Sequence, residues 1–485
     1  MALPLKDASL LKTQAYINGQ WVNGEEAQPF SVTNPATGEV ITHVANVSLS
    51  QVKAAITGAD DAIAQWKALP VKTRADVIER WYQLVLANRE DLAVIMTMEQ
   101  GKPLFESRGE VDYGAGYIKW FAEEAKRIYG DVLSSTSDRR GLVIKQPVGV
   151  VAAITPWNFP NAMITRKVAP ALAAGCTIVL KPAAETPLSA LALAELAARA
   201  GIPAGVFSVL PSNNSRMVGA ELTANPTVKK LTFTGSTPVG KLLMKQCVDT
   251  VKRTSMELGG NAPVIIFDDA DIEKAIQGAL ISKFRNSGQT CICANRLLVQ
   301  EGIYDEFVAK FSAAVEAFKL GNGMDETSTH GPVVTKKAAA DIQAKVDAAI
   351  AEGAQVHLGG KVSDLGEQFF EPTILTHVTD QMAIFKEEIF GPVAPIFKFT
   401  SEEEAIAMAN DTEFGLAAYV YTNNLSRIWR VSEAIEYGMV GVNETAISSE
   451  MIPFGGVKES GQGREGSKYG LDDYLETKYI CMGGL

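Results

Sequence analysis

The feature that most restricts the fold is an alternation that begins near residue 147, where short apolar runs are separated by turns and helical patterns. The runs are VGVVAAIT, TIVL, VFSVL, KKLTFT and PVIIF, and a helical pattern covers residues 188–200. Buried parallel strands give continuous apolar runs, and each needs a crossover, usually a helix, to reach the next strand. The alternation therefore predicts an α/β fold with a parallel sheet.

The chain on either side extends this pattern. Residues 48–100 predict helices, because apolar residues recur at spacings of four and three after a possible cap at Ser48 or Ser50. A second series predicts another α/β domain, with a strand at RLLVQ, helices near 303–318 and 336–352, and a strand near 438–443. A chain of 485 residues is long enough for two or three such domains.

Composition narrows the class of protein. The net charge of −11 argues against nucleic acid or an anionic membrane as a partner, since both need a basic footprint. We find no signal peptide and no run of about 18 apolar residues, so we expect a cytoplasmic protein without a membrane partner. The five cysteines and four histidines are scattered, which fits a reducing compartment and predicts no metal site.

The stretch FRNSGQTCICAN sets two of the five cysteines, Cys291 and Cys293, on either side of one isoleucine. A thiolate is the best side-chain nucleophile, so a cysteine on a polar turn is a plausible covalent catalyst. The alternative is a buried packing cysteine, which the residues of GQTC disfavour because they make a poor apolar pocket.

Two further segments carry polar side chains at predicted strand ends. Glu257 in SMELGGNAP precedes two glycines and could act as a general base, although a solvated loop glutamate is an equal alternative. Asn158 in ITPWNFP could donate to a developing oxyanion, and its alternative is an ordinary turn asparagine.

Two segments suggest a dinucleotide. In LTFTGSTPVGK a strand runs into Gly235 and Ser236 before a helix, which would let backbone N–H groups meet a pyrophosphate. The full glycine fingerprint is absent, so this signal is weak by itself. Lys181 in VLKPAAETP ends a buried strand where an adenosine ribose would lie, but a lysine there is usually a surface charge.

Taken together, these segments resemble the aldehyde dehydrogenase superfamily over nearly the whole chain, from YINGQW to KYICMGGL. ITPWNFPNAMITRK, SMELGGNAP, SKFRNSGQTCICANR, EEIFGP and PFGGVKESGQGREGSKYG are most similar to the succinate-semialdehyde dehydrogenases within it. By this resemblance Cys291 is the nucleophile, Asn158 and the Cys291 backbone N–H hold the oxyanion, and Glu257 activates the water that hydrolyses a thioester.

The resemblance also implies a cofactor, NADP, with NAD possible. The matching positions are Thr155, Trp157, Lys181, Ala184, Gly235, Ser236, Gly259, Glu388 and Phe390. Ala184 replaces the glutamate that NAD-preferring relatives carry, and this would admit a 2′-phosphate, although Glu185 could restore some repulsion. Without the resemblance, ordinary packing would be the interpretation of Glu388 and Phe390.

The implied substrate is succinate semialdehyde, whose distal carboxylate would meet Arg166, Arg285 and Ser448. A guanidinium suits a carboxylate because its planar fork can form two charge-assisted bonds. The alternatives are glutarate semialdehyde, a broader range of aldehydes, or arginines engaged only in salt bridges. Cys293 is a possible redox partner of Cys291, and the alternative is that it merely packs.

The resemblance implies an aldehyde dehydrogenase fold in three parts. A Rossmann-like cofactor domain would cover 1–127 and 148–259, an α/β catalytic domain 260–455, and a small β oligomerisation element 128–147 and 471–485. Exposed edge strands in that element predict a homodimer or homotetramer. A cysteine hydrolase is disfavoured because no histidine lies near a motif, and a non-catalytic protein because both nucleophile and base are present.

Overall fold

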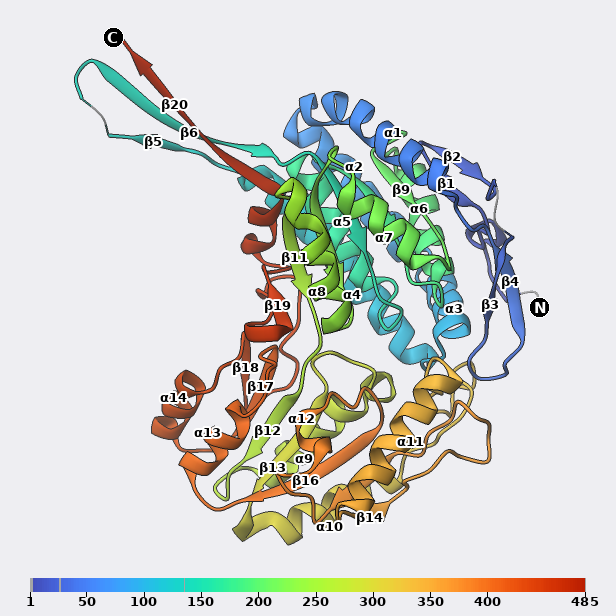
Figure 1. Ribbon diagram of the computed structural model, residues 1–485, viewed down its shortest axis with the longest axis vertical. Helices are drawn as coiled ribbons and strands as arrows, with labels where there is room; N and C mark the ends of the chain where they lie inside the picture. The colour runs from blue at the N-terminus through green and yellow to red at the C-terminus, as the bar shows by residue number, and fades with distance from the viewer. Residues whose placement is uncertain (1–2, 26–27, 135, 485) are drawn as a thin grey trace.

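The computed structural model describes residues 3–25, 28–134 and 136–484. Residues 1, 2, 26, 27, 135 and 485, which fall inside the predicted domain ranges, lie outside this description. Two large sheets with their helices form the body, and a narrow three-stranded arm projects from it (Figure 1).

The first sheet has the strand order β19-β11-β10-β7-β8-β9-β1-β2, and its five central strands run parallel. Four of the predicted apolar runs form β7, β8, β9 and β10 of this parallel centre, and the fifth, PVIIF, lies in a second sheet, which confirms the α/β prediction. Its strands are β1 (Ala15–Ile17), β2 (Gln20–Val22), β7 (Val150–Ile154), β8 (Thr177–Lys181), β9 (Phe207–Val209), β10 (Val228–Thr234), β11 (Arg253–Glu257) and β19 (Gly461–Gln462).

Helices from the first half of the chain pack with this sheet. The prediction over 48–100 is confirmed as three helices, and Ser48 is the cap, in a capping box with Gln51. The helices are α1 (Leu49–Ala68), α2 (Val71–Ala87), α3 (Arg89–Gln100), α4 (Leu104–Glu124), α5 (Ala162–Ala174), α6 (Pro187–Ala200), α7 (Ser215–Ala224) and α8 (Thr237–Cys247).

The second sheet has the order β14-β15-β16-β13-β12-β17-β18 and is parallel except for β14. Its strands are β12 (Ala262–Ile266), β13 (Ala294–Gln300), β14 (Gln355–Leu358), β15 (Thr373–Thr376), β16 (Val393–Phe399), β17 (Ala417–Tyr421) and β18 (Met439–Val442). The accompanying helices are α9 (Ile272–Phe284), α10 (Tyr304–Glu316), α11 (Lys336–Ala351), α12 (Ala383–Lys386), α13 (Glu402–Asn410) and α14 (Leu425–Ala434). The second predicted α/β series is thereby confirmed.

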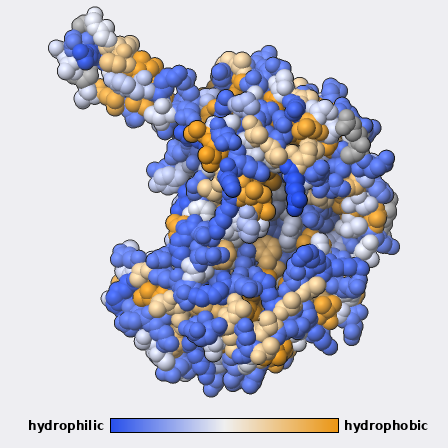
Figure 2. Space-filling view, viewed as in Figure 1, coloured by the Kyte–Doolittle hydropathy of each residue, from blue (hydrophilic) through white to orange (hydrophobic). Residues whose placement is uncertain are grey.

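The arm consists of β5 (Asp131–Leu133), β6 (Arg139–Pro147) and β20 (Leu475–Gly483), with β6 in the middle. It carries exposed apolar side chains, among them Val132 and Tyr479 at 79% and 60% exposure. Figure 2 shows hydrophobic surface on this arm, well away from the body. Strands β3 (Phe30–Thr33) and β4 (Val40–Val44) pair separately.

Short 3₁₀ turns complete the chain: η1 (Ala8–Leu10), η2 (Ala125–Arg127), η3 (Val248–Thr250), η4 (Arg285–Gly288), η5 (Glu301–Ile303), η6 (Lys458–Ser460) and η7 (Lys468–Tyr474). Strand β19 comes from near the end of the chain, yet it pairs with β11 of the first sheet. The exact domain boundaries stay a prediction. Within the described residues, no helix is both long and apolar enough to cross a membrane.

Candidate functional site

A cavity of about 260 Å³ lies where the carboxyl ends of the first sheet face the second α/β unit. In a parallel sheet such an edge collects the residues that follow each strand. Eleven predicted site residues line the cavity: Trp157, Asn158, Arg166, Gly235, Ser236, Gly259, Arg285, Cys291, Glu388, Phe390 and Ser448. Five others do not line it: Thr155, Lys181, Ala184, Glu257 and Cys293.

The loop that carries Cys291 is held in an unusual backbone conformation. Asn286 and Ser287 have φ of 52° and 54°, a region that side-chain-bearing residues rarely adopt. Asn286 is fixed from three directions: its N–H donates to Glu106 at 2.9 Å, its Oδ1 accepts from Gln100 at 2.9 Å, and its Nδ2 donates to the Asn158 carbonyl at 2.9 Å. These contacts offset the local strain and place the cysteine.

The two glycines after Glu257 make room for this loop. A Cβ on Gly260 would lie 2.3 Å from the carbonyl oxygen of Cys291, and one on Gly259 would lie 2.7 Å from a carboxylate oxygen of Glu388. Both distances are too short for a side chain. Gly260 is therefore required by the close approach of the Cys291 backbone, whereas a side chain at position 259 would displace the Glu388 carboxyl group.

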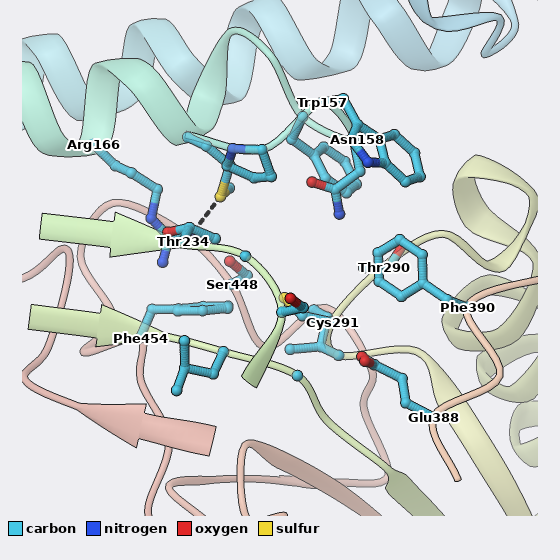
Figure 3. A pocket seen from close by; sticks show the side chains of 18 of the residues that line it. Trp157, Asn158, Arg166, Thr234, Thr290, Cys291, Glu388, Phe390, Ser448 and Phe454 are labelled. Atoms are coloured by element: carbon cyan, nitrogen blue, oxygen red, sulfur yellow. Dashed lines mark hydrogen bonds between the residues drawn. The ribbon is translucent and has the colours of Figure 1, made fainter. Parts of the chain in front are cut away.

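The thiol of Cys291 is half-buried and lies in the cavity (Figure 3). Burial raises its pKa to about 12, against the opposing effect of Arg166, while Glu257 and Glu388 raise it further. At neutral pH the side chain is therefore a protonated thiol, and its activation requires removal of that proton.

Asn158 is held rigidly from both its backbone and its side chain. Its carbonyl accepts from Lys102 Nζ at 2.7 Å, and its Nδ2 donates to the Gln289 carbonyl at 2.9 Å, next to the cysteine loop. An amide nitrogen has two hydrogens, so one remains for another acceptor. Asn158 can thus donate to an oxygen in the cavity without giving up its anchor.

A buried ion pair supports this arrangement. Lys102 Nζ lies 2.5 Å from Glu110 Oε2, and both side chains are almost fully buried. Glu110 Oε1 accepts the backbone N–H groups of Asn161 and Ala162 at 2.8 and 3.2 Å, at the start of α5. The pair therefore ties α4 to the turn that carries Asn158.

Glu257 ends β11, but its carboxyl group belongs to a buried charge cluster with Glu465, Arg166 and Lys167. Burial raises the pKa of Glu257 well above its ordinary value, and Glu465 adds to the shift. Glu465 makes ion pairs with Arg166 and Lys167, which outweigh its own burial and lower its pKa. Within the described chain, Oε2 of Glu257 has no hydrogen-bond partner.

Arg166 is fully buried, and it faces both this cluster and the cavity. Its guanidinium contacts Glu465 and lies 4.0 Å from the ring of Phe454, and Nη1 lies 3.7 Å from the Met163 sulfur. Its Nε faces Glu465 in that ion pair, whereas Nη2 finds no hydrogen-bond acceptor among the described residues. A buried guanidinium in this state can accommodate an anion from the cavity.

The labelled lining residues lie on different sides of Cys291. In Figure 3, Cys291 lies centrally, with Arg166 and Ser448 toward one side and Glu388 and Phe390 toward the other. Arg285, which also lines the cavity, lies 4.9 Å from the ring of Phe159. The cavity therefore has one end suited to a distal anion and another bordered by an aromatic ring and a carboxyl group.

The second end fits a dinucleotide. Ser236 caps α8 without a side-chain bond to the first turn, and the Thr234 hydroxyl is buried with no partner among the described residues. Trp157 and Phe390 meet edge to face at 5.6 Å. The pKa of Glu388 is raised to about 7 by burial, although Gly260 N–H donates to it at 3.0 Å. A helix N-terminus and unpaired hydroxyls suit phosphate and ribose groups.

The remaining predicted cofactor residues lie at the same sheet edge. Lys181 ends β8, donates to the Pro182 carbonyl at 3.0 Å, and has its pKa lowered to about 8 by burial. Thr155 follows β7, and its N–H donates to the Lys181 carbonyl at 3.1 Å. Ala184 is half-buried and Glu185 exposed.

Cys293 is buried outside the cavity lining, and its thiol donates to the Lys283 carbonyl at 3.4 Å. Both Cys291 and Cys293 are free thiols in this structure. The redox partnership of the two cysteines stays a prediction. Among the described residues, no cluster of three or more His, Cys, Asp or Glu could hold a metal ion.

The sequence analysis did not predict several of the residues that line the cavity. These are Tyr113, Pro156, Phe159, Met163, Thr234, Leu258, Thr290, Ile292 and Phe454. Most of them are next to a predicted residue in the sequence, so their position beside a motif could have identified them. Tyr113 had no such signal, because it comes from the middle of α4 and meets the site only through tertiary packing.

Comparison with known proteins agrees with this geometry. The family model described as "Aldehyde dehydrogenase family" matches residues 21–480. A glutarate-semialdehyde dehydrogenase of Pseudomonas aeruginosa is 57% identical over 484 residues, which cover 100% of each chain. A succinate-semialdehyde dehydrogenase (NADP(+)) of Escherichia coli is 55% identical over 482 residues, 99% of this chain and 100% of the relative.

A crystal structure described as an E. coli NADP dependent enzyme superposes with a TM-score of 0.98 at 55% identity, covering 99% of this chain and 100% of that one. The match therefore extends over both sheets and the arm. With nearly the full length covered by the family model and by these relatives, the chain is a member of the aldehyde dehydrogenase family.

Proposed function

We propose that this aldehyde dehydrogenase oxidises succinate semialdehyde to succinate and reduces NADP, through a thioester on Cys291. The observation that carries the proposal is one cavity with a nucleophilic thiol between two contrasting ends. Arg166 and Ser448 lie toward one end, and Glu388 and Phe390 toward the other (Figure 3).

In the first step the Cys291 thiol transfers its proton to water, its sulfur attacks the aldehyde carbon, and the carbonyl oxygen becomes an oxyanion. The free hydrogen of Asn158 Nδ2 and the Cys291 backbone N–H stabilise that oxygen. Donors of this kind are effective because they are already oriented when the charge develops. The cavity end with Glu388 and Phe390 would hold NADP, which would supply a hydride acceptor, and loss of hydride from the carbon bound to Cys291 would leave a thioester there.

In the second step water hydrolyses the thioester. Glu257 is the proposed base: its raised pKa makes its carboxylate a stronger proton acceptor than an ordinary glutamate. The bond between sulfur and the acyl carbon breaks, the acid is released, and the cysteine is restored.

The distal carboxylate of the substrate would lie against Arg166, Arg285 and Ser448. A carboxylate there could accept from Arg166 Nη2, which has no acceptor among the described residues and so supports this placement. Glutarate semialdehyde is the second candidate, supported by the similarity to the Pseudomonas aeruginosa enzyme of that name. One additional methylene group separates the two substrates.

NADP is proposed over NAD because Ala184 leaves no carboxylate to repel a 2′-phosphate, while Lys181 adds positive charge nearby. The name of the Escherichia coli relative supports the same choice. Glu185 remains as an exposed negative charge one residue on. NAD is therefore the alternative cofactor.

We further propose a homodimer or homotetramer in the cytoplasm. The exposed apolar residues of the arm support self-association, because a three-stranded sheet away from the body leaves its edges uncovered. The acidic, cysteine-poor composition supports the location and argues against nucleic acid or an anionic membrane as partners.

A panel of aldehydes tests the substrate and cofactor together. The purified protein is assayed with succinate semialdehyde, glutarate semialdehyde and butanal, each with NADP and NAD, by absorbance of the reduced cofactor. We expect the highest kcat/KM with succinate semialdehyde and NADP. Cys291→Ala provides the blank and should show no turnover while it still binds NADP.

Each alternative predicts a different order of kcat/KM values in this panel of aldehydes and cofactors. A higher kcat/KM for glutarate semialdehyde would transfer the assignment to the five-carbon substrate. Equal efficiency with butanal would overturn carboxylate recognition altogether. A higher kcat/KM with NAD would overturn only the cofactor choice.

A further inference from the structure

The hydroxyl of Tyr113 lines the cavity and contacts Ser448 Oγ, a residue of the proposed substrate site. It is also 3.0 Å from the hydroxyl of Tyr117, which lies one turn further along α4. The Tyr117 hydroxyl is 3.2 Å from the backbone carbonyl of Ser449. Four oxygens thus form a continuous chain from the cavity back to the segment that carries Ser448.

The Ser449 carbonyl, at the end of this chain of hydrogen bonds, determines which hydroxyl donates to which. A carbonyl oxygen can only accept, so Tyr117 must donate its single proton to Ser449. Burial raises the pKa of Tyr117 well above its ordinary value, so that proton is retained. The Tyr117 oxygen then accepts from Tyr113, and Tyr113 in turn accepts from Ser448.

This chain of hydrogen bonds supports a segment of the protein that has no regular secondary structure. Ser448 lies between β18 and β19, outside any helix or strand. The same face of α4 approaches this segment closely: a Cβ on Gly116 would lie 3.1 Å from Glu450 Oε2. Side chains on irregular segments need such support from rigid elements to keep a fixed geometry.

The same two tyrosines also border the buried arginine. The Arg166 guanidinium lies 5.5 Å from the ring of Tyr117, and the rings of Tyr113 and Tyr117 meet edge to face at 5.1 Å. One face of α4 therefore contacts both the hydroxyl and the guanidinium assigned to the distal end of the substrate.

We propose that Tyr113 is a positioning residue for substrate specificity, which orients the Ser448 hydroxyl toward the distal carboxylate of the aldehyde. This inference rests on the proposed function. When a carboxylate enters, it can only accept, so Ser448 turns its proton to the substrate. Tyr113 then turns its own proton from Tyr117 to Ser448 Oγ. Only O–H bonds rotate, and Tyr117 continues to donate to Ser449.

The test compares Tyr113→Phe with the wild type on succinate semialdehyde and butanal. Loss of a neutral hydrogen bond, about 1 kcal/mol, should raise KM for succinate semialdehyde about 3- to 10-fold. Its kcat, and both parameters for butanal, should stay within about twofold. Tyr82→Phe, the same chemical change on α2 outside the cavity lining, is the matched control and should alter neither substrate.

A double-mutant cycle with Ser448→Ala tests whether Tyr113 acts through the serine. In the Ser448→Ala background, Tyr113→Phe should cause no further rise in KM. A full additional rise would overturn positioning through Ser448, and an equal loss on butanal would show a merely structural role. If the wild type itself does not prefer succinate semialdehyde, the proposed function fails. A retained preference that Tyr113→Phe leaves unchanged would refute only the role of the tyrosine.

Discussion

The two ends of the proposed substrate differ in how the protein holds the groups around them. At the reacting end, Asn158 is anchored through backbone atoms: Lys102 and Asn286 both donate to its carbonyl. At the distal end, Ser448 lies on an irregular segment and is oriented by a phenol hydroxyl from α4. The anchor of Asn158 is buried and multiply connected, whereas the orientation of Ser448 depends on a side-chain contact.

This difference suggests a division of roles within one cavity. Groups that stabilise charge in the reaction must keep their orientation for every aldehyde, so rigid backbone anchors suit them. Groups that select among aldehydes contact only the variable end, and a change in their side chains need not disturb the nucleophile. Substitutions at the two ends should therefore change different kinetic parameters.

The largest effect should come from Asn158→Ala, which removes one of the proposed oxyanion donors. We expect kcat to fall about 100- to 1,000-fold, equally for succinate semialdehyde and butanal, because the oxyanion is common to both. Steady-state kinetics with both aldehydes measures this, and retained NADP binding controls for folding. A loss of less than tenfold, or a loss confined to one aldehyde, would contradict the proposal that Asn158 acts at the reacting end on every aldehyde.

The next effect concerns Cys291, the proposed nucleophile. The raised pKa of Cys291, about 12, means that its thiolate fraction should grow about tenfold per pH unit throughout the neutral range. Alkylation of Cys291 by iodoacetamide in the cofactor-free protein should therefore accelerate about 100-fold between pH 7 and pH 9. Mass spectrometry of the peptide that contains Cys291 follows the rate, and a plateau below pH 9 would contradict the buried, protonated thiol.

A smaller effect should follow from Arg285→Ala, at the distal end. We expect KM for succinate semialdehyde to rise about tenfold or more, because a hydrogen bond to a charged group contributes about 1.5–3 kcal/mol. Butanal should be barely affected. Arg285→Lys retains the charge without the planar fork and should lie between the wild type and the alanine variant. An equal loss for both aldehydes would locate carboxylate binding elsewhere.

Much of the molecule could be predicted from the chain itself. The apolar runs predicted the parallel strands β7, β8, β10 and β12, because burial on both faces leaves a continuous hydrophobic signature. The capping residue Ser48 was one of two candidates, since a serine before a periodic helix is a local signal. The segments around Asn158, Glu257 and Cys291, taken together with the others, identified the family, as the match over residues 21–480 bears out.

Only the tertiary structure decided the environment of those residues. Nothing local indicates that Glu257 belongs to a buried cluster with Glu465, or that Tyr113 reaches Ser448 across 335 positions of sequence. The pKa of Cys291 likewise depends on burial and on charges from distant segments. Sequence patterns record short-range periodicity and motif identity, whereas desolvation and hydrogen-bond direction arise from groups that folding brings together.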